Sequence, residues 1–173
     1  MSELFSIQLQ NRQQQGRDGV WLDLPTTTEQ VQAALRQIGI SSDNPQGLFI
    51  SGYFAEEEKR FAIPYNMVLA SNVDELNFLA SRLETLSTGE RAELNAALQA
   101  PQSELFSIGR ITDFPENVEY YVYLPDVRGP AQLGDYYLNR SGMVDMPEEW
   151  KGGIDTAQFG RYVTQQEQGA FTQ

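Results

Sequence analysis

Residues 19–39 have the sequence GVWLDLPTTTEQVQAALRQIG, in which a strand pattern stops at a proline and a helix pattern follows. The run before Pro25 has the branched and aromatic residues typical of a strand. The threonines after it offer N-caps, Glu29 and Gln30 are placed to complete a capping box, and Gly39 supplies the C-terminal stop. Apolar residues recur at helical spacing in between: Val31, Ala34, Leu35 and Ile38. With a second strand pattern at 47–55 (GLFISGYFA), these residues predict a small sheet with one helix packed on it.

The hexapeptide SELFSI occurs twice, at residues 2–7 and again at 103–108. Each copy is followed by a turn pattern, then a β-rich run ending in Leu-Pro, and then a segment of helical character that ends at a glycine (Gly39 and Gly142). We interpret this as two diverged strand–turn–strand–helix units, about 100 residues apart. The alternative is coincidence combined with shared hairpin patterns.

Residues 72–100 have no strand pattern and show helix patterns instead. Asn72 with Glu75 three residues later predicts a helix start, and Ser87 with Glu90 predicts a second one. The first of these helices has an apolar stripe: Val73, Leu76, Leu79, Ala80, Leu83 and Leu86. The chain is therefore expected to have an α+β fold in three small segments, in which two sheet-plus-helix units flank a helical middle segment. The expected divisions are 1–62 (sheet plus helix), 63–101 (helical) and 102–173 (strands plus short helices).

The composition excludes several classes of enzyme. The 173 residues include no Cys and no His, so there is no disulfide, thiol nucleophile, Ser-His-Asp triad or HExxH zinc site. The sequence has no P-loop, GxGxxG or GxSxG motif either. A carboxylate Mg²⁺ site around Asp135, Asp145 and Asp155 is conceivable, but nothing in their spacing recommends it. We therefore expect neither catalysis nor a cofactor or metal.

The chain is strongly acidic. Its 24 acidic and 12 basic residues give a formal charge of −12, and the pI is about 4.3. The first 55 residues, with five acids and three bases, contribute only −2 of this charge. Such a field repels nucleic acid and attracts basic proteins. Direct binding of nucleic acid is therefore not expected.

The spacing of the acids is also informative. Carboxylates at i and i+3 or i+4 on a helix lie about 5–6 Å apart, close to the phosphate spacing of roughly 7 Å along a DNA strand. Candidate helical pairs are Glu90 with Glu93, and Asp145 with Glu148 or Glu149. Charge alone does not separate a DNA mimic from a protein whose acids only keep it soluble.

Targeting signals are not evident. No apolar run approaches the roughly 20 residues that a membrane span needs. Residues 1–16 are polar and rich in Gln, without the apolar core of a signal peptide. A cytoplasmic protein is therefore expected, without a membrane partner.

A series of motifs resembles the ArdA antirestriction family in order and spacing, over essentially the whole chain. They are GVWLDLP (19–25), DELNFLA (74–80), LGDYYL (133–138), GID (153–155), FGR (159–161) and GAFT (169–172). The resemblance implies a small acidic protein of plasmids or conjugative transposons, acting in the bacterial cytoplasm. It further implies an elongated homodimer whose surface mimics bent B-form DNA and occupies the DNA groove of type I restriction-modification enzymes, on their methyltransferase core.

On this interpretation the acids after residue 55 stand in for phosphates. The predicted acidic surface is Glu56, Glu57, Glu58, Asp74, Glu75, Glu84, Glu90, Glu93, Asp113, Glu116, Glu119, Asp126, Asp135, Asp145, Glu148, Glu149 and Asp155. The family resemblance associates residues 133–144 with a dimer contact, for which the candidates are Leu133, Tyr136, Tyr137, Leu138, Met143 and Val144. An intramolecular core face is the other interpretation of these apolar residues.

Two further expectations concern the tryptophans and the partner. Trp21 and Trp150 are expected to pack in the core or at a hinge rather than to anchor a partner. The alternative function is a generic acidic interaction module that inhibits or scaffolds another basic DNA-binding protein.

Overall fold

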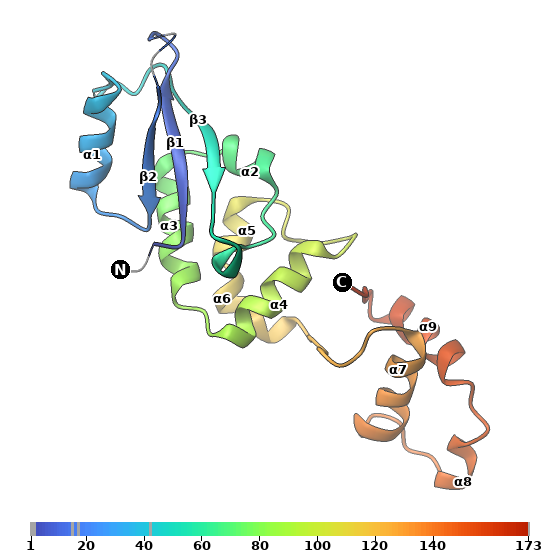
Figure 1. Ribbon diagram of the computed structural model, residues 1–173. Helices are drawn as coiled ribbons and strands as arrows, with labels where there is room; N and C mark the ends of the chain where they lie inside the picture. Colours follow the sequence, from blue (N-terminus) through green and yellow to red (C-terminus); the bar gives the residue numbers. More distant parts are fainter. Residues whose placement is uncertain (1–2, 15, 17, 42, 173) are drawn as a thin grey trace. The chain divides into compact units, whose positions relative to one another are not determined.

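The computed structural model describes residues 3–14, 16, 18–41 and 43–172 (Figure 1). The chain forms two compact units. Unit 1 comprises residues 1–98 and 103–121, and unit 2 comprises residues 99–102 and 122–173.

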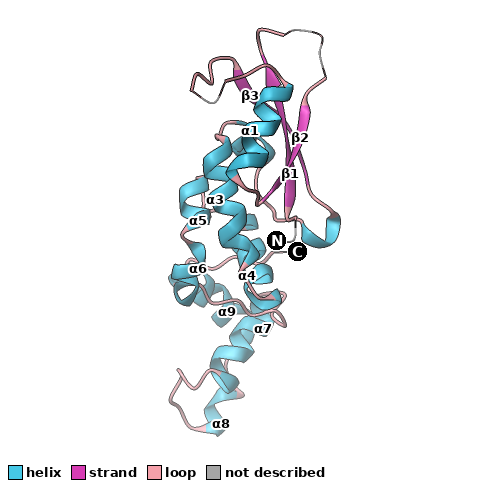
Figure 2. Cartoon of the chain, turned by 90° about the vertical axis from the view of Figure 1, so that its left-hand side faces the viewer, coloured by secondary structure: helices cyan, strands magenta, loops and turns pink. Residues whose placement is uncertain are grey.

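Unit 1 contains an antiparallel sheet of three strands, β1 (Phe5–Asn11), β2 (Val20–Leu24) and β3 (Leu48–Phe54), in the order β2-β1-β3 (Figure 2). Ile7 pairs with Leu22 on one side and with Tyr53 on the other. Burial alternates along β1, because side chains in a strand point to opposite faces. The apolar set of Phe5, Ile7 and Leu9 is therefore buried, whereas the polar residues between them are only half-buried.

Helix α1 (Thr28–Gln37) begins and ends as the sequence predicts. The Gln30 amide donates to the Thr27 hydroxyl at 3.4 Å, and the Thr27 amide donates to the Gln30 side chain at 3.4 Å, which completes a capping box. After the helix, Gly39 has φ +70°, a left-handed conformation that glycine adopts without a Cβ clash.

The rest of unit 1 is helical. Its elements are η1 (Glu57–Lys59), α2 (Tyr65–Leu69), α3 (Val73–Glu84), α4 (Thr88–Gln99), α5 (Ile108–Thr112), α6 (Phe114–Asn117) and η2 (Val118–Tyr120). Asn72 accepts from the Glu75 amide at 2.9 Å, and Ser87 and Glu90 form a reciprocal cap. Both helices predicted for 72–100 are thus confirmed. The core of unit 1 joins the sheet to these helices; its largest fully buried side chains include Leu24, Leu76, Leu83, Leu94 and Phe114.

Two asparagines connect the helical layer to segments that leave the sheet. Asn77 on α3 accepts from the Thr26 amide at 2.7 Å and donates to the Thr26 carbonyl at 3.0 Å. Asn95 on α4 accepts from the Ala62 amide at 2.8 Å and donates to the Arg60 carbonyl at 3.4 Å. Each amide side chain therefore satisfies one backbone donor and one backbone acceptor, as the backbone of a paired strand would.

Unit 2 consists of α7 (Pro130–Asp135), the π-helical turn η3 (Tyr136–Arg140), α8 (Glu148–Lys151) and α9 (Thr156–Gln166). Helices α7 and α9 cross very closely at two glycines. A Cβ on Gly134 would overlap the Thr156 carbonyl, and a Cβ on Gly160 would overlap the Pro130 carbonyl. Glycine at both positions is therefore what permits this crossing.

The α+β class is confirmed, but the strands expected at 102–173 are not found: the described residues 102–172 form helices and loops only. In the second SELFSI copy, Ser107 accepts from the Arg110 amide at 3.3 Å and caps α5. The first copy continues as Gln-Leu-Gln, which alternates like a strand, whereas the second continues as Gly-Arg-Ile, which places Ile111 three residues after Ile108 on a helix. Ser2 of the first copy lies outside the described residues. The β-rich run at 121–125 is loop without a paired strand, and the boundaries at 62 and 101 stay predictions.

Candidate functional site

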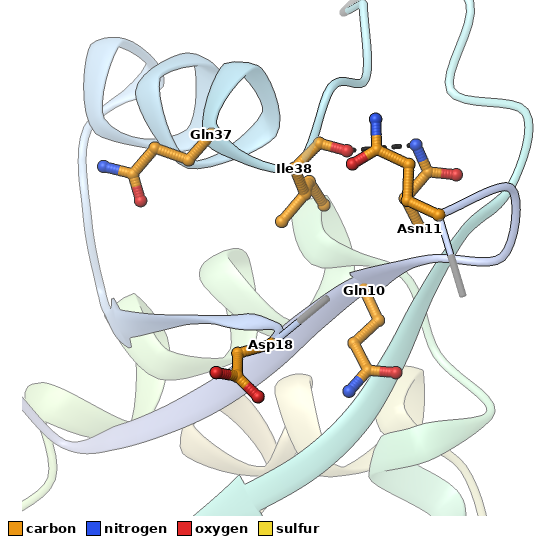
Figure 3. Close-up of a pocket in the computed structure, with 6 residues that line it drawn as sticks. Gln10, Asn11, Asp18, Gln37 and Ile38 are labelled. Atoms are coloured by element: carbon orange, nitrogen blue, oxygen red, sulfur yellow. Dashed lines mark hydrogen bonds between the residues drawn. The ribbon is translucent and has the colours of Figure 1, made fainter. Parts of the chain in front are cut away.

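One small cavity lies between the end of β1 and the C-terminal end of α1 (Figure 3). It has a volume of about 20 Å³, which is room for about one water molecule. Its lining is mostly polar, and across it the Asn11 side chain donates to the Ile38 carbonyl at 3.0 Å. This cavity is too small for an organic substrate.

The carboxylates do not gather into a metal centre. Within the described ranges, no three of them lie close enough together to hold a metal ion. Asp135, Asp145 and Asp155, which the sequence left as a conceivable Mg²⁺ set, therefore do not form one.

All seventeen acids of the predicted surface are described, and none of them is buried. Thirteen are exposed, whereas Glu84, Glu90, Glu93 and Asp135 are half-buried. Every one of these side chains can therefore reach solvent. Unit 1 holds 17 acidic and eight basic residues, a charge of −9, and unit 2 holds seven and four, a charge of −3. Most of the negative field thus belongs to unit 1.

At least four of these acids form ion pairs with nearby bases. The pairs are Glu56–Lys59 at 3.0 Å, Arg82–Glu116 at 2.7 Å, Arg140–Asp135 at 3.8 Å and Lys151–Glu148 at 2.6 Å. Each carboxylate in them is at least half exposed, and exposed pairs contribute about 0–1 kcal/mol. Such pairs reduce the local negative charge but can reopen at little cost.

The two predicted helical pairs have different outcomes. Glu90 and Glu93 both lie on α4, where burial and the charge of Glu90 raise the pKa of the Glu93 carboxyl above its ordinary value. Hydrogen bonds from the Ser87 hydroxyl and amide lower the pKa of Glu90. Asp145, by contrast, precedes α8 and lies in a loop, so a helical pair with Glu148 or Glu149 is wrong. Pro147 explains this, because a proline disfavours helical backbone in the residue before it.

The candidate dimer residues fall into three groups by burial. Leu138 is buried in unit 2 and Met143 is 73% exposed. The other four are half-buried: Leu133, Tyr136, Tyr137 and Val144. Burial therefore favours the core interpretation for Leu138 and leaves Met143 accessible to a partner.

Several aromatic side chains are exposed that sequence reasoning either placed inside or missed. Trp21 is 49% exposed on β2 and Trp150 is 66% exposed on α8, so the core part of the expectation is wrong for both, while the hinge alternative stays a prediction. Phe78 on α3 is 60% exposed and Tyr120 at the end of η2 is 77% exposed. Phe78 could have been found from the sequence, because it is out of phase with the apolar stripe of its helix.

None of the described helices combines the length and apolar character that crossing a bilayer requires.

Comparisons with known proteins place this chain in a family. No curated protein matches the chain. The family model described as antirestriction protein (ArdA) matches residues 15–173, nearly the whole sequence. The chain therefore belongs to the ArdA antirestriction protein family.

Proposed function

We propose that this protein is an antirestriction protein that acts as an acidic DNA mimic in the DNA-binding groove of type I restriction-modification enzymes. The observation that carries the proposal is the family match over residues 15–173. The charge of −12 and the solvent access of all seventeen predicted acids support the mimicry. In this role the protein is an inhibitor in the bacterial cytoplasm and not an enzyme.

The proposed mechanism is electrostatic. A DNA-binding groove is lined with Lys and Arg that are already arranged to receive phosphates, so a folded array of carboxylates meets a complementary potential. Opposite charges also steer the two proteins together and speed their association. Because many weak contacts share the binding energy, reversing one acid costs little.

The partner that fits this mechanism is the methyltransferase core, since it binds the target DNA. We expect its affinity for the protein to fall steeply between about 50 and 200 mM salt, as for other phosphate-like contacts. An affinity that does not change with salt would contradict the mechanism.

The sharpest test compares two sets of three exposed acids. We expect the triple variant Asp74→Lys, Asp113→Lys and Glu119→Lys to lose protection of unmodified phage DNA in cells with a type I system. The matched control is the triple variant Glu3→Lys, Asp18→Lys and Asp43→Lys. Both variants change the net charge by the same amount, and all six positions are exposed.

The control is expected to protect as the wild type does, because its acids lie outside the predicted surface. Equal loss in both variants would point to net charge rather than a surface. A wild-type protein that fails to protect, yet captures another basic DNA-binding protein from cells without type I subunits, would favour the generic acidic module.

We also propose that the protein is a homodimer formed through unit 2. Among the described residues of unit 2, only Leu138 and Val163 are buried apolar side chains. So small a core gives little stability on its own, and association is a common way to supply more. Accessible apolar groups such as Met143 would then be covered by the second copy.

The dimer has a direct test in solution. Met143→Asp is expected to shift the sedimentation coefficient from dimer to monomer, while Val122→Asp, at an 81% exposed apolar residue outside the candidate contact, leaves it unchanged. A wild-type protein that sediments as a monomer at all concentrations would overturn the proposal.

A further inference from the structure

Helix α3 presents an aromatic ring in the middle of its polar face. Phe78 is 60% exposed and follows Asp74 by four residues and Glu75 by three, so both carboxylates neighbour it on the helix. Arg82 follows Phe78 by four residues on the same face. An exposed ring at such a position contributes nothing to the core of unit 1, whose α3 residues lie on the opposite face.

The surface continues from α3 onto α6. The guanidinium of Arg82, in the last turn of α3, pairs with Glu116 on α6 at 2.7 Å. Tyr120, which is 77% exposed, lies at the end of η2, four residues after Glu116 and next to Glu119 in the sequence. We call this the α3–α6 surface; it comprises Asp74, Glu75, Phe78, Arg82, Glu116, Glu119 and Tyr120. It combines four acids, one base and two exposed rings within unit 1.

The same fold contains an arginine held by such a combination of ring and carboxylate. Beside α5, the Arg110 guanidinium lies 4.5 Å from the centre of the Phe106 ring and 3.8 Å from the Glu104 carboxylate. A ring and a carboxylate thus hold one guanidinium together. Arginine also lies over the rings of Phe49, Phe61 and Tyr136. Among the described residues, no cation lies over Phe78 or Tyr120, so these two rings are open to a guanidinium from outside.

We propose that the α3–α6 surface binds arginine side chains of the partner's DNA-binding groove, with guanidinium groups stacked on Phe78 and Tyr120 and paired with the adjacent carboxylates. The identity of the partner rests on the proposed function. The surface is complementary to such a groove in charge, and arginine suits it better than lysine because the planar guanidinium both stacks and pairs.

The exposed rings should make the salt dependence of binding weaker than that of a purely anionic mimic. Pairing between exposed charges is screened by salt, whereas stacking and the apolar contact of a ring are screened much less. Part of the affinity should therefore survive at high salt, and that part should depend on the two rings.

The test is the double variant Phe78→Ala with Tyr120→Ala, measured for binding to the purified methyltransferase core at low and high salt. We expect at least a tenfold loss of affinity at both salt concentrations. A loss of this size is usual when an aromatic hot-spot residue of an interface is replaced by alanine. Phe78→Trp with Tyr120→Phe keeps both rings and is expected to bind within about twofold of wild type. Phe54→Ala, at a 59% exposed ring on β3, is the matched control and should change nothing. Circular dichroism checks that each variant is folded.

The outcomes separate this inference from the proposed function. If the wild type binds the core and the charge-reversed variant does not, while the ring variant binds like wild type, the inference fails and the proposed function stands. The same holds if Phe54→Ala loses as much affinity as the double variant.

A second probe does not need the enzyme. Oligoarginine is expected to bind the wild type more tightly than oligolysine of equal length, and the ring variant should lose that preference. An absence of preference in the wild type would overturn the inference even if the methyltransferase core proved not to be the partner.

Discussion

Replacing Gly160 by alanine is expected to destabilise unit 2 by about 3 kcal/mol or more, the upper range for forcing extra volume into a packed contact. The new Cβ would overlap the Pro130 carbonyl and lie 2.9 Å from the Gly134 amide nitrogen, and both are backbone atoms that cannot rotate away. Helices α7 and α9 would have to separate. With Leu138 and Val163 as its buried apolar side chains among the described residues, unit 2 has little stability to lose.

The tryptophans allow each unit to be followed separately. Trp21 belongs to unit 1 and Trp150 to unit 2, so their indole N–H resonances report the two units in one NMR spectrum. In Gly160→Ala the Trp150 signal should move to its unfolded position while the Trp21 signal stays. Gly152→Ala is the control in the same unit, because its Cβ would meet no atom within 4 Å and its φ of −65° suits alanine. A native Trp150 signal in Gly160→Ala would show that the helices tolerate a wider separation.

Asn77→Leu is expected to lower the free energy of unfolding of unit 1 by about 2–4 kcal/mol. Leucine has nearly the same shape but leaves the Thr26 amide and carbonyl without their partner, and each unpaired buried polar group costs about 1–3 kcal/mol. Both hydrogen bonds are part-buried, which places the expected loss below the sum of two full penalties.

Urea unfolding of the Asn77 variants measures this effect. Asn77→Asp keeps an acceptor for the Thr26 amide but has no donor for the carbonyl at neutral pH, so its loss should be smaller than that of leucine. Asn66→Leu, at an exposed asparagine on α2, is the control and should remain within about 0.5 kcal/mol of wild type. If both leucine variants have equal stability, Asn77 does not hold the turn before α1.

Local signals predicted the N-terminal sheet, α1, α3 and α4, because each has its pattern and cap within a few residues. Asn72 and Ser87 cap the helices that they were expected to cap, and Thr27 is the one of the three candidate threonines that caps α1. The short helix α2 was missed, since its five residues are too few to show a period.

Features that depend on tertiary structure could not be predicted in this way. Arg82 and Glu116 are 34 residues apart, and no pattern in the sequence around either residue predicts their ion pair. The tryptophans show a related limit. An antiparallel sheet can leave one face to solvent, so a large apolar residue such as Trp21 on β2 need not be buried. All seventeen predicted acids reach solvent, whereas the surface that they are predicted to form stays a prediction, and their charge alone does not reveal which of them neighbour an exposed ring.

The two SELFSI copies bear on how short peptides encode conformation. The described part of the first copy, residues 3–7, leads into β1, whereas the same residues of the second copy lead into the cap of α5, so the information that separates these outcomes lies in the following three residues and in the tertiary neighbours. An isolated SELFSI peptide should therefore have no fixed conformation. Chimeras that exchange residues 8–10 with 109–111 would place each copy in conflict with its tertiary surroundings. The secondary structure of such chimeras would measure how strongly tertiary contacts override the local sequence.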